Sequence, residues 1–195
     1  NLNFKHKKWF DFNFEHNYSI KKNDWPEIIL ETLKDSVKRS TLSDVPMSCA
    51  LSGGLDSQAV VGLLSKIGHK PKTFSLAFEG YEEGEFNELK SAKIIAQQYE
   101  TDHEEIIIDQ KTYFEDLDKM VFHLDEPYGG GLPLWHVFKN AGKNYGVMLT
   151  GLGGDELFGN YGKWTLLEKT FFNFINNKYQ YKTLIFDRKN FFSNE

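Results

Sequence analysis

The sequence predicts an α/β protein in which a parallel sheet carries helices on both faces. Short apolar runs alternate along the chain with longer segments that have helical periodicity, and this alternation is typical of parallel sheets. Glycine-rich turns follow two of the apolar runs. Because the carboxyl ends of parallel strands meet at one sheet edge, where ligands bind, these turns predict a ligand site there.

The expected elements follow one another in a regular order. Asp24 and Pro26 mark the start of a helix over 25–39, since a capping carboxylate and an early proline are typical of helix starts. A strand over 47–51 and a helix that ends near Gly68 come next. The other expected elements are an alternating strand within 1–19, a strand over 72–78, a loop over 79–85, a helix over 86–99, a strand over 104–108, a helix over 112–124, a loop over 125–131, a helix over 133–142, a strand over 146–150 and a helix over 163–177.

Composition is that of an ordinary soluble globular protein, with 40% hydrophobic and 26% charged residues in a chain of 195. The net charge of −5 and the lack of a long basic block argue against nonspecific nucleic-acid binding. No apolar run approaches membrane-spanning length, so we expect no membrane partner and a cytoplasmic location. The single cysteine, Cys49, excludes an internal disulfide and is expected to be a buried core thiol.

The first glycine-rich turn, residues 52–57, has the layout of a phosphate site and is called the first loop. Gly53 and Gly54 let backbone N–H groups approach an oxyanion, and the following helix N-terminus adds further donors. Ser52 and Ser57 offer hydroxyl donors. Asp56 repels phosphate unless a divalent cation lies between them. No lysine follows as in the common phosphate loop; the alternative is a chance serine–glycine turn.

A second loop, residues 150–155, follows the last predicted strand of the sheet. It places Asp155 at a helix start, on a loop that neighbours that of Asp56. Two carboxylates at one sheet edge suit Mg²⁺, which takes oxygen ligands and bridges to phosphates; the alternative for Asp155 and Glu156 is charge complementarity with the helix N-terminus. The six histidines have no metal-ligand spacing, which argues against zinc. The segment 125–127 is expected to line a substrate pocket, or else to end a helix.

The first loop resembles the pyrophosphate loop of the N-type ATP pyrophosphatases. Together with Asp-Glu-Pro at 125–127 and Thr-Gly-x-Gly-Gly-Asp-Glu-Leu-Phe-Gly-x-Tyr at 150–161, it resembles the synthetase domain of the glutamine-hydrolysing asparagine synthetases. The resemblance implies an adenine-nucleotide hydrolase-like (Rossmann-like) three-layer sandwich. It also implies three regions: a linker from a missing glutaminase domain over 1–24, an ATP pyrophosphatase domain over 25–163, and the helical start of a truncated C-terminal region over 164–195.

The same resemblance implies ATP and Mg²⁺ as cofactors and a carboxylate substrate, with aspartate as one candidate. The carboxylate would become an acyl-adenylate, which ammonia from a glutaminase domain absent from this chain would attack. Asp56 and Asp155 would be the catalytic metal ligands. The implied nucleotide contacts are Leu51, Leu76, Thr150 and Gly151 to adenosine, and Ser52, Gly53, Gly54, Leu55, Asp56 and Ser57 to pyrophosphate.

Two positions depart from the family pattern. Leu152 stands where asparagine synthetases usually carry a glutamate that assists proton transfer, and leucine cannot serve as a base. Asn87 replaces a frequent aspartate, and the later lysine that contacts pyrophosphate falls outside this chain. These departures leave open a β-lactam synthetase-like cyclase, another amidotransferase, or a nucleotide-binding module without turnover. The second loop argues against a GMP synthetase.

Overall fold

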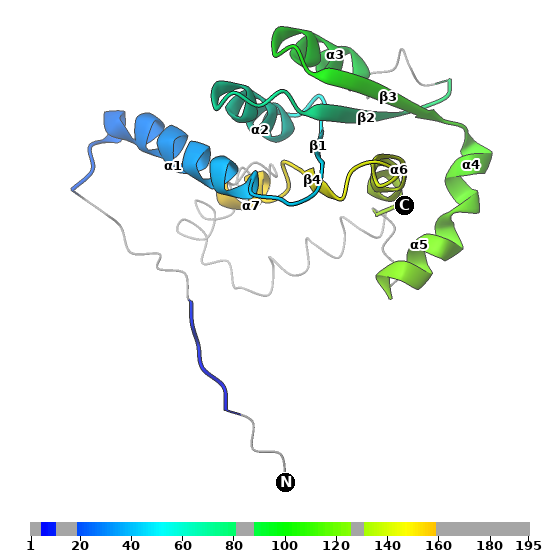
Figure 1. Cartoon of the computed structure of the whole chain (residues 1–195), viewed down its shortest axis with the longest axis horizontal. Coiled ribbons are helices and arrows are strands. Elements are labelled where there is room, and N and C mark those ends of the chain that lie inside the picture. Colours follow the sequence, from blue (N-terminus) through cyan, green and yellow to red (C-terminus); the bar gives the residue numbers. More distant parts are fainter. Residues whose placement is uncertain (1–4, 11–18, 81–87, 126–130, 159–195) are drawn as a thin grey trace, which may run out of the picture.

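The computed structural model describes residues 5–10, 19–80, 88–125 and 131–158. Within these ranges the chain forms one parallel sheet in the order β3-β2-β1-β4 (Figure 1). This order matches the first four strands of the doubly wound, Rossmann-like sheet. The predicted fold class is therefore confirmed. The strands are β1 (Met47–Ala50), β2 (Lys72–Phe78), β3 (Asp102–Ile108) and β4 (Val147–Leu149).

Helices cover both faces of the sheet, which gives three layers. On one face α1, α2 and α3 pack together, and on the other face α6 packs against β2 and β3 (Figure 1). Helices α4 and α5 continue from the end of β3. None of these helices has both the length and the apolarity needed to cross a membrane. Their bounds are α1 (Trp25–Ser40), α2 (Leu55–Lys66), α3 (Leu89–Gln98), α4 (Gln110–Glu115), α5 (Leu117–Leu124), α6 (Leu132–Ala141) and α7 (Gly154–Phe158), with a 3-10 turn at Lys22–Asp24.

Two apolar clusters hold the layers together, one on each face of the sheet. Cys49 lies at the centre of the first cluster and is fully buried, so the prediction of a core thiol is confirmed. Burial raises the pKa of this thiol to about 12, which keeps it protonated and unreactive. The first cluster comprises Val37, Cys49, Leu51, Val61, Leu63, Leu64, Ala92 and Ala96, and the second Phe74, Ile106, Ile108, Val137 and Ala141.

The single helix predicted over 112–124 is wrong, because the chain forms α4 and α5 with a break at Asp116. The carboxylate of Asp116 is buried and bonded to α6, and this contact holds the chain between the two helices. Met120 is buried, but Leu117 and Leu124 are 38% and 45% exposed.

Three smaller predictions change at the ends of elements. The third strand begins at Asp102 rather than 104, because Lys72 of the neighbouring strand pairs with Asp102 in the sheet and bonds to its carboxylate. Asp24 precedes α1 without a side-chain capping bond. Residues 5–10 form no strand. The predicted helix over 163–177, and the start of the one predicted over 86–99, lie outside the described residues.

Candidate functional site

The first loop joins the end of β1 to the start of α2, and its own hydroxyl groups hold it closed. Ser57 Oγ accepts a hydrogen bond from the Ser52 N–H at 3.0 Å and lies 2.9 Å from Ser52 Oγ. Ser52 Oγ in turn accepts from the Gly54 N–H at 3.1 Å. Ser57 is only 7% exposed, so its hydroxyl bonds within the loop. We call the bonds between Ser52 and Ser57 the clasp of the first loop.

The first turn of α2 leaves backbone donors available beside this clasp. The first backbone hydrogen bond of α2 runs from the Gln58 N–H to the Gly54 carbonyl oxygen, 3.3 Å away. The N–H groups of residues 55–57 precede it, so they have no acceptor within the helix. Leu55 itself is 75% exposed, and Gly54, which precedes the helix, has no side-chain cap for it. Three donors with the positive end of the helix dipole therefore face the loop, an arrangement that suits an anion.

The second loop lies directly against the start of α2. A β-carbon added to Gly151 would come within 2.6 Å of the Ser57 nitrogen and 2.9 Å of Asp56 Cβ. One added to Gly154 would come within 2.4 Å of Asp56 Cγ. Such distances are far below ordinary contact, so only glycine permits this approach. The parallel pairing of β1 with β4 brings the two loops to one sheet edge, as predicted.

The carboxylates of this edge fit a divalent cation bridged to phosphate. Within the described ranges, Asp56 has no hydrogen-bond or ion-pair partner, although it is partly buried between the two loops. Asp155 follows Gly154 in the first turn of α7 and is also partly buried. No cluster of three or more metal-ligating side chains occurs in the described part of the chain. Two carboxylates are nevertheless enough for Mg²⁺, which completes its shell with water and phosphate oxygens.

The other predicted nucleotide contacts lie in different surroundings. The Leu51 side chain is 1% exposed in the first core cluster, and its carbonyl oxygen accepts from the Ser75 hydroxyl. Leu76 is partly buried against the second cluster. Thr150 Oγ1 accepts from the Leu152 N–H at 3.4 Å, and the Leu152 side chain is 72% exposed. The structure thus gives Leu51 a core position, whereas Leu152 is open to solvent.

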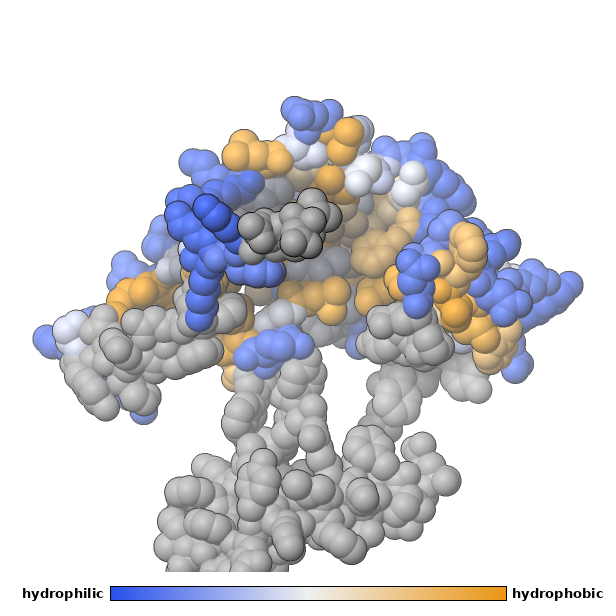
Figure 2. Space-filling view, turned by 90° about the horizontal axis from the view of Figure 1, so that it is seen from below, coloured by the Kyte–Doolittle hydropathy of each residue, from blue (hydrophilic) through white to orange (hydrophobic). Residues whose placement is uncertain are grey.

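Apolar residues also reach the surface around these polar loops. Figure 2 shows apolar and polar residues side by side on the face seen from below. Besides Leu55 and Leu152, the described end of the chain exposes Leu157 and Phe158, at 71% and 56%. The segment 125–127, predicted to line a pocket, is described only at Asp125, which ends α5 with a left-handed backbone, φ 57°.

One contact of the first loop was not predicted from the sequence. Glu88 Oε2 accepts a hydrogen bond from the Gly53 N–H at 3.2 Å. The two residues are 35 positions apart, and only the packing of α3 beside α2 brings them together. No local pattern in the sequence signals such a contact.

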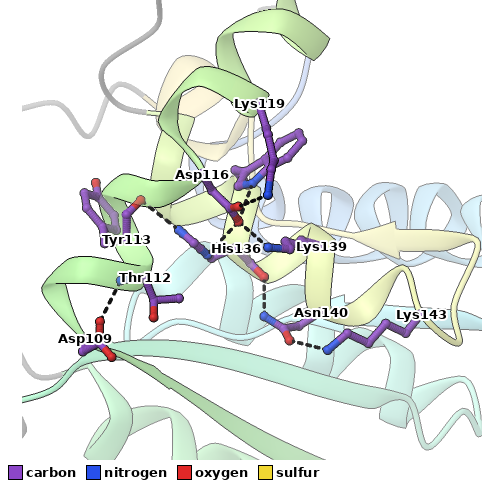
Figure 3. Close-up of polar contacts among 10 residues, drawn as sticks. Asp109, Thr112, Tyr113, Asp116, Lys119, His136, Lys139, Asn140 and Lys143 are labelled. Atoms are coloured by element: carbon purple, nitrogen blue, oxygen red, sulfur yellow. Dashed lines mark hydrogen bonds and ion pairs between the residues drawn. The ribbon is translucent and has the colours of Figure 1, made fainter.

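A second polar cluster lies between α5 and α6 (Figure 3). The Asp116 carboxylate accepts hydrogen bonds from Lys139 Nζ, from Trp135 Nε1 at 3.2 Å and from Lys119 Nζ at 3.3 Å. His136 Nδ1 lies 3.8 Å from the same carboxylate. The bond from Lys139 holds the pKa of Asp116 down, at about 2. Trp135, His136 and Lys139 link Asp116 to α6, and Lys119 belongs to the helix that Asp116 precedes, so we assign this cluster to the stability of the fold.

His103 and His123 both have structural contacts. His103 Nδ1 lies 2.9 Å from Thr73 Oγ1, and burial lowers the pKa of this imidazole. His123 stacks on Trp135 with ring centroids 5.6 Å apart. Neither contact involves the first or the second loop.

Comparisons with known proteins agree on one family. The family model described as asparagine synthase matches residues 29–188. A Methanocaldococcus jannaschii protein assigned as a glutamine-hydrolysing asparagine synthetase is 39% identical over 133 residues, covering 66% of this chain and 25% of that protein. Asparagine synthetase 1 of Bacillus subtilis, also glutamine-hydrolysing, is 36% identical over 135 residues, covering 68% of this chain and 21% of that protein. The matched part spans a quarter or less of these relatives.

Solved structures are matched more weakly. The NH3-dependent NAD synthetase from Campylobacter jejuni has a TM-score of 0.39 and 14% identity, over 87% of this chain and 86% of that chain. The NMN synthetase from Francisella tularensis has a TM-score of 0.36 and 20% identity, over 52% of this chain and 40% of that chain. Likenesses at these scores do not bear on function.

Proposed function

Because this chain belongs to the asparagine synthase family, we propose that it forms the ATP-binding part of a carbon–nitrogen ligase. The observation that carries the proposal is the contact between the two loops. Gly154 of the second loop lies against the Asp56 carboxylate in the open first turn of α2, and Asp155 follows Gly154 in the chain. Anion donors and the two carboxylates that would hold a metal thus belong to one sheet edge, which is the usual ligand edge of such folds.

The residues of the first loop would bind the β- and γ-phosphates of ATP. The N–H groups of residues 55–57 supply donors, and the clasp between Ser52 and Ser57 holds the loop in shape. Asp56 and Asp155 would hold Mg²⁺, which when bound neutralises charge on the phosphates. Leu76, Thr150 and Gly151 would contact the adenosine part. In this arrangement the protein mainly orients ATP and stabilises the departing pyrophosphate.

The reaction that this arrangement supports has two steps. An oxygen of the substrate carboxylate attacks the α-phosphorus of ATP, the bond to the β-phosphate oxygen breaks, and pyrophosphate leaves with the electron pair. Ammonia then attacks the acyl carbon of the acyl-adenylate, AMP leaves, and the attacking nitrogen loses a proton. A glutaminase domain would supply the ammonia. The acceptor is a small carboxylate, with aspartate as one candidate.

Leu152 favours an acceptor other than aspartate as a second candidate function. Its side chain is 72% exposed beside the second loop, and it carries no group that accepts a proton. A β-lactam synthetase-like cyclisation or another amide-forming step would still use the same activated carboxylate. A nucleotide-binding module without turnover would bind ATP and release neither product.

A product assay tests these possibilities together. The whole protein is incubated with ATP, Mg²⁺, ammonia and a panel of amino acids, and AMP and pyrophosphate are measured. Equal amounts of AMP and pyrophosphate with at least one carboxylate support the ligase. Tight ATP binding without release of either product with any member of the panel favours the binding module. Release of ADP and phosphate instead would contradict the proposed cleavage between the α- and β-phosphates.

A further inference from the structure

Glu88 connects helix α3 to the first loop. Its carboxylate accepts a hydrogen bond from the Gly53 N–H at 3.2 Å. Glu88 occupies the N-cap position of α3, yet its side chain makes no capping bond to that helix. An N-cap side chain ordinarily satisfies the N–H groups of its own helix. The Glu88 side chain instead accepts a hydrogen bond from a backbone N–H of the first loop.

The position of Glu88 is set by the core and not by the loop. Leu89, Ala92 and Ala96 anchor α3, with exposures of 7%, 0% and 3%. A β-carbon added to Gly53 would lie 3.1 Å from Glu88 Cβ and 3.2 Å from Ser91 Cβ. Gly53 therefore packs closely on the start of α3, and its N–H lies within reach of the Glu88 carboxylate.

The acceptor of the Gly53 N–H differs in charge from the acceptors of the neighbouring N–H groups of the first loop, because it is the carboxylate of Glu88. The Ser52 and Gly54 N–H groups donate to the hydroxyl oxygens of Ser57 and Ser52, which are neutral. A carboxylate oxygen resembles a phosphate oxygen in charge and in its preference for N–H donors. The Gly53 N–H is thus engaged by an internal anion at the place where the proposed function puts a phosphate.

We propose that Glu88 occupies the position of a phosphate oxygen when no nucleotide is bound, and that it thereby lowers the affinity of the first loop for ATP. This inference rests on the proposed function. A phosphate oxygen that takes the Gly53 N–H must displace the carboxylate, because two anions close together repel each other. The side chain of Glu88 is exposed, so it has room to rotate away. The measured association constant is then the intrinsic constant multiplied by the fraction of molecules in which the loop is free of Glu88.

Two substitutions distinguish this role from a positioning role. Glu88→Gln removes the charge but keeps an oxygen that accepts from Gly53, whereas Glu88→Ala removes both. Glu79→Gln is the matched control, since Glu79 directly follows β2 and its side chain has no described contact with the first loop. Titration calorimetry of the full chain with ATP and with pyrophosphate, each in Mg²⁺, gives the affinities.

We expect both Glu88 variants to bind pyrophosphate and ATP about two- to tenfold more tightly than the wild type, because both remove the negative charge that competes with phosphate for the Gly53 N–H. Glu79→Gln should bind as the wild type does. Weaker binding by Glu88→Ala with normal binding by Glu88→Gln would overturn the inference, because it would show that Glu88 positions the loop. Unchanged affinity in both variants would overturn it as well.

The same titrations separate this inference from the proposed function. If the wild type binds ATP and the Glu88 variants do not bind more tightly, only the role of Glu88 fails. If neither the wild type nor any variant binds ATP or pyrophosphate, the proposed function fails and the inference fails with it. Circular dichroism and urea unfolding establish that each variant is folded. Should Glu88→Ala not fold, Glu88→Gln decides the question, since it keeps the bond to Gly53.

Discussion

Gly154 and Asp56 lie in direct contact across the two loops. A β-carbon on Gly154 would stand 2.4 Å from Asp56 Cγ, and 2.6 and 2.7 Å from the two carboxylate oxygens. The Asp56 carboxylate therefore rests against backbone that has no side chain, one residue before Asp155. Because Asp155 directly follows Gly154 in the chain, this contact places the two residues of the proposed metal site on neighbouring backbone.

Gly154→Ala should move the Asp56 side chain and weaken binding of ATP with Mg²⁺ by roughly tenfold. The clash involves a side chain that can rotate, so the free energy of unfolding should fall by only about 1 kcal/mol. Calorimetry and urea unfolding measure the two effects. Gly68→Ala is the control: φ at Gly68 is 87°, so alanine there should cost stability without changing ATP affinity. Normal ATP affinity in Gly154→Ala would contradict the importance of this contact.

Asp56→Asn should lower the affinity for ATP with Mg²⁺ by roughly 10- to 100-fold, because an amide is a poorer magnesium ligand than a carboxylate. Titrations with and without Mg²⁺ check the metal dependence. Asp44→Asn changes the charge equally on the exposed segment before β1, and should leave binding unchanged. Equal affinity with and without Mg²⁺, together with no effect of Asp56→Asn, would rule out the metal role.

Gly54→Val should abolish nucleotide binding while the fold stays largely intact. Gly54 has φ −79° and ψ 152°, which valine adopts readily, so no backbone strain arises. Among the described residues, a β-carbon there would meet only Ser52 Oγ, at 3.3 Å. The bulkier side chain would instead block the approach of phosphate to the loop. Circular dichroism tests the fold and calorimetry tests binding; a folded variant that binds ATP normally would mean that the loop is only structural.

Asp116 should make the stability of the protein depend on pH in acid. The bond from Lys139 holds its pKa at about 2 in the folded protein, below the ordinary 3.8. Since the folded pKa is depressed, the stabilisation is present above about pH 4 and is lost as the pH falls toward 2. Urea unfolding at several pH values should show this loss in the wild type.

Asp116→Asn should lower the free energy of unfolding by about 1–3 kcal/mol near neutral pH, because the buried bonds lose their charged acceptor. It should also flatten the dependence of stability on pH between 4 and 2. Asp118→Asn, a change at an exposed residue in the first turn of α5, is the control for charge. An equally steep pH dependence in Asp116→Asn and in the wild type would show that other groups cause it.

Leu152 should prevent efficient asparagine formation. An exposed leucine beside the second loop provides no base for the proton that is lost when ammonia attacks. We expect the whole protein to make little asparagine from aspartate, ATP, Mg²⁺ and ammonia. Leu152→Glu alone should not restore it, because the acceptor pocket should also differ. Mass spectrometry of the products decides, and asparagine formed at about 1 per second or faster would contradict this prediction.

The sequence by itself determined most of the order of the elements and the position of the two glycine-rich loops. Helical periodicity and short apolar runs placed the strand Lys72–Phe78 and the helix Leu132–Ala141 within one residue of their bounds, because burial of one face leaves a periodic pattern. Glycine followed by an acidic residue after two strands located both loops. The rule that parallel strands end at one sheet edge was enough to predict that these loops are neighbours.

Only the tertiary structure decided the contacts between residues far apart in the chain. The break at Asp116 depends on Lys139 and Trp135 of another helix, and the bond from Gly53 to Glu88 depends on how α3 packs beside α2. The approach of Gly154 to Asp56 depends on the pairing of β1 with β4. Local patterns record which face of an element is buried, but not which side chain it meets there, because that partner is chosen by packing in three dimensions.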